Sequence, residues 1–368
     1  MKPDQPSKLL RSFPVNIIPF DSGLIVKRGR NEIKIGGEGS GRAVRIILAA
    51  TSSSGISEDE LCHLFPEEDR SKITQIVAEL ARKQFLTYQQ PEEVAPVRLE
   101  SNEDLFYWHF GTNRTDAHEQ LAKARLLILG INTISRQLAA SLIMAGFTNL
   151  TFLDHPSLRN LNLYDESHSI RPNAWPKALP LPQVYESFPD PETFDCLVST
   201  SDFGISPVLS ECNIWCVNSN RAYLPIFLDN AIGYIGPMII PGETACFACL
   251  QARQNSHLQN IVIRETINRV SFEGQNVAGF HPSMAASLAE FAALELTKFY
   301  SRLFQPQVGT LIEINLLATH LTARKVLKIP RCPICSPLIN RPSITSSQST
   351  FKDPEKRQKK LSMVSDNE

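Results

Sequence analysis

Two Cys-x-x-Cys pairs constrain this chain more than any other feature. Cys246 and Cys249 form the first pair, Cys332 and Cys335 form the second, and residues 250–331 lie between them. Each pair places two thiolates on one reverse turn, so two such turns supply four sulfurs for a tetrahedral metal site. Because protein sulfur fills all four positions, the pattern predicts a closed, structural zinc site without a catalytic role. The alternative is two unrelated pairs of buried cysteines.

A strand–helix–strand pattern begins at residue 125. Residues 125–129 form an apolar run that enters Gly130, residues 135–144 have a helical pattern, and residues 150–154 form a second strand that ends at Asp154. This order is typical of one half of a Rossmann sheet, in which such an acid binds a ribose hydroxyl.

The loop after Gly130 departs from a phosphate-binding loop. Such loops read G-x-G-x-x-G, because bare backbone must approach phosphate over a helix N-terminus. Here only the first glycine remains, and Asn132 and Ser135 stand where the others belong. Their Cβ atoms would crowd the phosphates, so we predict a retained fold with a degenerate nucleotide site.

The first 90 residues predict a domain of their own. Apolar runs and turn signals between residues 15 and 36 predict short antiparallel strands. Three helical stretches follow, at residues 41–50, 57–65 and 71–86. Ser57 and Glu60 form the pattern of a capping box at the start of the second helix. This order predicts a winged helix-turn-helix.

Charge argues against the DNA binding that such a domain often performs. Thirty-seven Lys and Arg residues face 38 Asp and Glu residues, for a net charge of -1, whereas nucleic-acid binders need a basic excess. The third helix has no Asn/Arg cluster at its start. A groove between the last strand and this helix can instead accept a peptide as an added strand.

The rest of the chain predicts one larger α/β domain and two flanking segments. We expect a winged-helix domain at 1–90, a linker and helix at 91–124, a Rossmann domain at 125–340 and a disordered tail at 341–368. No apolar run approaches the ~20 residues of a membrane span, and no signal peptide is evident, which predicts a cytoplasmic protein.

Several later elements are also predicted from pattern. We expect further sheet strands at 195–199, 214–217 and 224–228, a buried helix at 285–299, and a closing hairpin at 309–315 and 320–327. Cys212 and Cys216, which are four residues apart, are predicted to be buried.

The stretches LLILG, STSD, GPMIIPGETACFACL and PRCPICSP occur in this order and span most of residues 125–337. They resemble the ThiF/MoeB-like (ubiquitin-activating-enzyme-like) superfamily. With a winged helix in front, the chain resembles the leader-peptide-binding partner proteins of thiazole/oxazole-modified peptide biosynthesis, the cyclodehydratase "C" or ocin-ThiF-like proteins.

The resemblance implies a function in natural-product (bacteriocin-like) biosynthesis. The chain would bind the leader of a ribosomally made precursor peptide and present it to a separate YcaO-type cyclodehydratase, which uses ATP to form azolines. The leader would add a strand between residues 32–36 and the third helix. The expected contact residues are Ile33, Lys34, Ile35, Lys72, Ile76, Arg82 and Lys83. A homodimer is also expected.

Departures from the family pattern separate two hypotheses. Adenylating members carry D-x-D where this chain has Asp154-His155-Pro156, and an arginine where it has Leu163. Leucine cannot neutralise phosphate charge, which favours a non-catalytic partner. The competing hypothesis is an ATP-dependent enzyme that adenylates the precursor itself. Lys177 and Asp202 would then be the catalytic lysine and the magnesium ligand, with Gly130 and Asp154 beside the nucleotide. The alternative for Lys177 is a surface lysine, and the alternative for Asp202 is a helix N-cap.

Overall fold

The computed structural model describes residues 8–21, 23–29, 31–52, 55–89, 102–108, 110, 112, 114–256, 262–263, 266, 279–303 and 307–336. The predicted linker after residue 90 and the predicted tail at 341–368 lie outside these residues. Two compact units divide the chain. The first contains residues up to 125 with 138–150 and 290–306, and the second contains 126–137, 151–289 and residues from 307 onward. Each unit has its own hydrophobic core.

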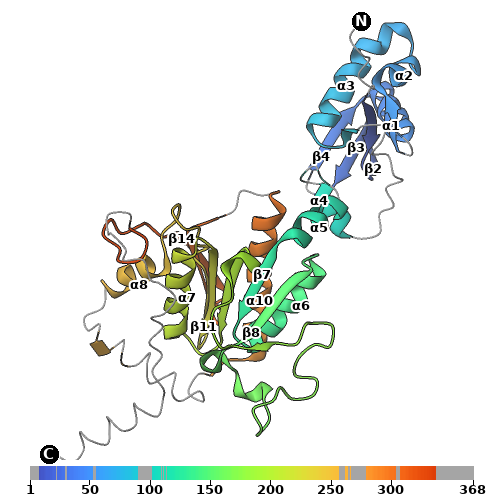
Figure 1. Cartoon of the computed structure of the whole chain (residues 1–368). Helices are drawn as coiled ribbons and strands as arrows, with labels where there is room; N and C mark the ends of the chain where they lie inside the picture. The colour runs from blue at the N-terminus through green and yellow to red at the C-terminus, as the bar shows by residue number, and fades with distance from the viewer. Residues whose placement is uncertain are drawn as a thin grey trace, which may run out of the picture. The chain divides into compact units, whose positions relative to one another are not determined.

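The first unit begins with short antiparallel strands and three helices, labelled in Figure 1. Its strands are β1 (Leu9–Ser12), β2 (Asn16–Phe20), β3 (Gly23–Arg28), β4 (Asn31–Gly36), β5 (Ile56–Ser57) and β6 (Leu86–Gln89). They form two three-stranded sheets, in the orders β2-β3-β4 and β5-β1-β6. Its helices are α1 (Glu38–Thr51), α2 (Glu58–His63), α3 (Arg70–Arg82), α4 (Asn102–Trp108) and α5 (Arg114–Lys123).

Strands β2, β3 and β4 and helices α1, α2 and α3 lie in or close to the predicted ranges, although α3 ends at Arg82 rather than at residue 86. Strands β1, β5 and β6 and helix α4 were not predicted. The capping box forms, with the Glu60 N–H donating to Ser57 Oγ at 3.2 Å and the Ser57 N–H donating to Glu60 Oε2 at 3.1 Å. Helix α3 buries Ile73, Val77 and Leu80, which are four and three residues apart and therefore share one face. Each such side chain contributes about 1.5–3 kcal/mol of hydrophobic stabilisation.

An eight-stranded sheet forms the centre of the second unit. Its strands are β7 (Arg125–Leu129), β8 (Asn149–Asp154), β9 (Gln183–Val184), β10 (Cys196–Ser201), β11 (Ala222–Asp229), β12 (Ile232–Ile235), β13 (Thr310–Asn315) and β14 (His320–Lys325). The order is β14-β13-β12-β11-β10-β7-β8-β9. β10 pairs in parallel with β7 and β11, and β12, β13 and β14 extend the sheet antiparallel. All six side chains of β10 are buried, as expected of a strand covered on both faces.

Helices α6 (Thr133–Met144), α7 (Pro207–Asn218), α8 (Phe247–Asn255) and α10 (Pro282–Ser301) complete the larger elements. The predicted closing hairpin is confirmed as β13 and β14. The strand predicted at 214–217 is wrong, because these residues belong to α7. The burial of Cys212 and Cys216 is confirmed, and their four-residue spacing fits one face of this helix.

Helix α10 extends over the predicted range, but it is not buried all round. Phe291 and Leu294 are exposed by 42% and 46%, because they lie three residues apart on one outward face. Among the described residues, no helix combines the length and the apolar composition that crossing a membrane requires.

Candidate functional site

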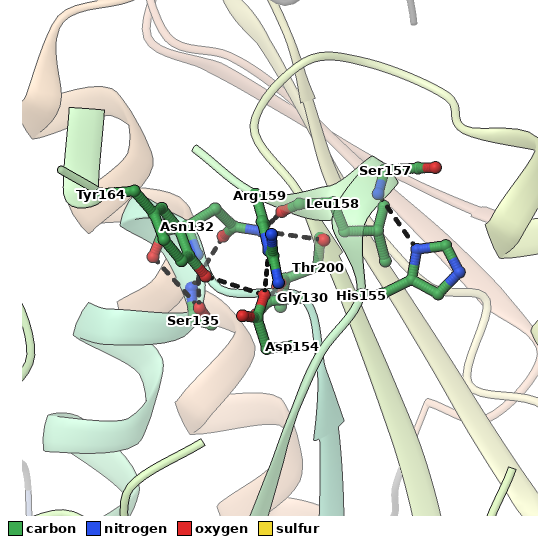
Figure 2. A network of polar contacts seen from close by, with 10 residues as sticks. All are labelled: Gly130, Asn132, Ser135, Asp154, His155, Ser157, Leu158, Arg159, Tyr164 and Thr200. Atoms are coloured by element: carbon green, nitrogen blue, oxygen red, sulfur yellow. Dashed lines mark hydrogen bonds and ion pairs between the residues drawn. The ribbon is translucent and has the colours of Figure 1, made fainter. Parts of the chain in front are cut away.

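The loop between β7 and α6 is closed by the side chain of Asn132, which is fully buried. Figure 2 shows its side-chain amide between Leu158, which follows β8, and Thr200 near the end of β10. Asn132 Nδ2 donates to the carbonyl oxygens of Leu158 at 3.1 Å and Thr200 at 2.9 Å. Its Oδ1 accepts from the backbone N–H groups of Ile134 and Ser135, both at 3.1 Å. Asn132 therefore caps α6 and links the β7–α6 loop to the segment after β8 and to the end of β10.

The three backbone N–H groups that follow Asn132, in the first turn of α6, all donate to protein oxygens, so none of them is available to a phosphate. In addition to Ile134 and Ser135, the Thr133 N–H donates to Asp202 Oδ2 at 3.0 Å. Gly130 before the loop has φ +101°, and a Cβ there would lie 2.6 Å from the Thr200 carbonyl oxygen. Amides at a helix N-terminus are the groups that bind phosphate, and here protein oxygens occupy them.

Asp154 ends β8 as predicted, but its carboxylate is also engaged. Asp154 Oδ1 accepts from Arg159 Nε at 2.7 Å and from the Tyr164 hydroxyl at 2.8 Å, and the residue is 6% exposed. The hydrogen bond to Asp154 raises the pKa of Arg159, and burial together with this carboxylate raises the pKa of Tyr164. Sequence reasoning missed Arg159 as the partner, although an arginine five residues after the acid was a visible signal.

His155 follows in the same loop and is neutral at neutral pH. Burial lowers the pKa of His155 to about 4. Its Nδ1 accepts from the Ser157 N–H at 3.2 Å, as drawn in Figure 2, and its ring lies 4.6 Å from the ring of Tyr185. These contacts indicate a structural role for the His155 side chain at the end of β8.

Asp202 and Lys177 are not brought into contact. Asp202 Oδ2 accepts from Asn160 Nδ2 at 2.8 Å as well as from Thr133. Its Oδ1 is buried and has no hydrogen-bond partner among the described residues, and burial raises the pKa of this carboxyl. Lys177 lies exposed in a turn and makes no hydrogen bond or ion pair with Asp154 or Asp202.

The four cysteines of the two Cys-x-x-Cys pairs converge, and their ligand atoms lie within 4.8 Å of one another. The Sγ–Sγ distances are 3.9 Å for Cys246–Cys249, 3.6 Å for Cys246–Cys332 and 3.5 Å for Cys249–Cys335. Four sulfurs at ~2.3 Å from a tetrahedral zinc would lie ~3.8 Å apart, so the residues fit such an ion.

The surroundings of the cysteines also suit a metal. Burial raises the pKa of Cys335 to about 11, so a cation is needed to hold that sulfur as thiolate at neutral pH. The Ile329 N–H donates to Cys249 Sγ at 3.4 Å, a contact that would orient this ligand. These four residues could hold a metal ion, and no position of the set is left for a substrate.

The residues predicted to contact a peptide lie on β4 and α3, except Lys83, which follows α3 as its C-cap. Ile33 and Ile35 of β4 and Ile76 of α3 are half-buried against the core of the first unit, whereas Lys34 is exposed. At one end the two elements meet, where Asn31 Nδ2 donates to the Lys83 carbonyl oxygen at 3.3 Å.

Two of the predicted basic contacts already have acidic partners on α3 or just before it. Lys72 pairs with Asp69 at 2.9 Å, and Arg82 pairs with Glu79 at 2.5 Å. All four side chains are more than 40% exposed, so solvent screens both pairs and the basic groups can exchange partners.

The two edges of the β2-β3-β4 sheet differ. Among the described strands, β4 pairs on one side only, with β3, and it contains no proline. β2 is the opposite edge and contains Pro19, which has no N–H to donate. An added strand would therefore form a more complete ladder on β4 than on β2.

No protein-family model matches this chain. Protein HesA of Leptolyngbya boryana is 23% identical over 244 residues, which cover 60% of this chain and 80% of HesA. E. coli MccB, solved with AMPCPP and MccA, aligns with a TM-score of 0.63 and 18% identity over 89% of this chain and 99% of MccB.

A heterocyclase solved with substrate and cofactor aligns with a TM-score of 0.57 and 18% identity over 90% of this chain, but over only 40% of the heterocyclase. These likenesses, taken with the sheet order, show that this chain has the fold of MccB.

Proposed function

We propose that this protein binds the leader of a ribosomally made precursor peptide and presents it to a separate YcaO-type, ATP-dependent cyclodehydratase. One observation supports a non-catalytic role above all. The side-chain oxygen of Asn132 accepts from the N–H groups at the helix N-terminus, where a nucleotide phosphate would bind. Asp154 is likewise bound to Arg159 and Tyr164. A nucleotide would have to displace both sets of contacts.

The substrate class is supported by the structures with the same fold. MccB is described as the microcin C7 biosynthetic enzyme in a complex with N-formylated MccA, and the heterocyclase structure holds a substrate. We infer that this chain also acts in peptide modification, with residues 1–90 as a winged-helix recognition domain. The leader would pair with the open edge of β4, over Ile33 and Ile35, and alongside α3.

The metal in this proposal is zinc with a structural role. Zinc bound by Cys246, Cys249, Cys332 and Cys335 would join the start of α8 to the segment that follows β14. Because all four ligands are protein sulfurs, the ion supplies no chemistry to the reaction.

One observation favours the competing function, an enzyme that adenylates the precursor itself. Asp202 is buried and keeps Oδ1 without a partner among the described residues, and a carboxylate oxygen of this kind is a preferred magnesium ligand. In that case Lys177 and Asp202 would act on Mg-ATP after the Asn132 loop opens.

Calorimetry with Mg-ATP on the purified, zinc-loaded protein separates the two functions. No heat of binding up to millimolar nucleotide is the result expected of a non-catalytic partner. Binding that disappears in Lys177→Ala would overturn that role and make the chain the activating enzyme. Lys328→Ala is a control that removes another exposed lysine.

A further inference from the structure

An open pocket of about 570 Å³ lies in the first unit, between the β2–β3 turn and the beginning of α1. Pro19, Phe20 and Leu24 supply its apolar surface. Gly41 allows α1 to lie close to the sheet, because a Cβ at this position would come within 3.1 Å of Leu24 Cδ2. The pocket is separate from α3, so it is not the groove assigned above to the leader.

Two arginines give this pocket a positive charge. Arg42 and Arg45 both line it from α1, and their three-residue spacing places them on one face of the helix. Both are exposed and make no hydrogen bond or ion pair with another described residue. Asp21 also lines the pocket, so two guanidinium groups against one carboxylate leave the lining residues with a net positive charge. Guanidinium groups beside an apolar wall suit a carboxylate next to a bulky apolar side chain.

We propose that this pocket binds an acidic residue and its apolar neighbour in the precursor peptide, next to the segment that pairs with β4. This inference rests on the proposed function. β4 ends at Gly36, and Gly37 lines the pocket. A strand added antiparallel to β4 begins beside Gly36, so the residues that precede it in the peptide reach the pocket. Arg42 and Arg45 then select leaders that are acidic at this point.

The test uses the full-length, zinc-loaded protein and the pentapeptide Gly-Glu-(4-fluoro-Phe)-Asp-Gly, followed by ¹⁹F NMR titration. The peptide has the acidic and apolar groups but is too short to form a stable ladder with β4. We expect saturable binding that weakens at least tenfold in the double variant Arg42→Ala/Arg45→Ala. The exposed-arginine control Arg324→Ala/Arg331→Ala should bind like the wild type.

Two companion peptides complete the test. Replacing both acids by Gln and Asn should weaken binding at least tenfold, as should replacing the aromatic residue of the acidic peptide by a fluorinated alanine. Equal binding of the neutral peptide, or an equal loss in the Arg324/Arg331 control, would overturn the proposal. Failure of the pentapeptide to bind would overturn the pocket alone, because the proposed function is tested separately by calorimetry with Mg-ATP.

Discussion

Replacing Asn132 by alanine should destabilise the second unit by about 3 kcal/mol. The change removes an N-cap, which costs about 1 kcal/mol. It also takes the amide donor away from the buried carbonyl oxygens of Leu158 and Thr200, at about 1 kcal/mol for each acceptor. Because Asn132 is fully buried, water does not replace these contacts at the surface.

Urea unfolding followed by tryptophan fluorescence measures this loss, since Trp175 and Trp215 both belong to the second unit. With a slope of about 3 kcal/mol per M, the midpoint should fall by about 1 M. Asn162→Ala, at an exposed position nearby, should change stability by less than about 0.5 kcal/mol. A loss below about 1 kcal/mol for Asn132→Ala would refute the idea that this amide holds the loop closed.

Three further predictions concern the second unit. Elemental analysis of the wild type should find zinc, and Cys332→Ser should abolish it and lower Tm by about 10 °C, the shift for about 3 kcal/mol; unchanged zinc content would contradict the site. Lowering the pH from about 6.5 to about 4 should destabilise the protein by up to about 3 kcal/mol. The reason is that His155 binds a proton near pH 6.5 in the unfolded chain, but only near pH 4, its pKa in the folded protein. His155→Gln should flatten this dependence and exposed His168→Gln should not. Arg159→Ala should cost about 3–5 kcal/mol because it leaves the buried Asp154 carboxylate with the Tyr164 hydroxyl but without its cation. The loss should shrink in an Asp154→Asn background, and additive losses would contradict the coupling.

Local patterns in the sequence were sufficient for most of the elements. The apolar run into Gly130, the capping box at Ser57 and the alternation in the closing hairpin each specify a conformation over a few neighbouring residues. The exception was residues 214–217, where a short apolar run fits a strand and a buried helix equally well. The four-residue spacing of Cys212 and Cys216 was the signal that favoured the helix.

The candidate site was only partly visible in the sequence. Asn132 and Ser135 stand where a phosphate-binding loop has glycines, and this predicted a degenerate loop, because their Cβ atoms occupy space in any arrangement of the fold. It did not predict that Asn132 would take the place of the ligand. Likewise, Asp154 was placed at the end of its strand, but its ion pair with Arg159 was not foreseen.

The sequence alone determined most of the strands and helices, because they depend on local periodicity, but not β1, β5, β6, α4 or the helical state of residues 214–217. It also paired the two cysteine motifs, because together they supply a complete set of four ligands. Only the tertiary structure decided what the β7–α6 loop contains. The acceptors of the Asn132 amide belong to Leu158 and Thr200, which are 26 and 68 residues away along the chain. Such contacts exist only after the sheet has assembled, since no local preference brings these carbonyl groups together.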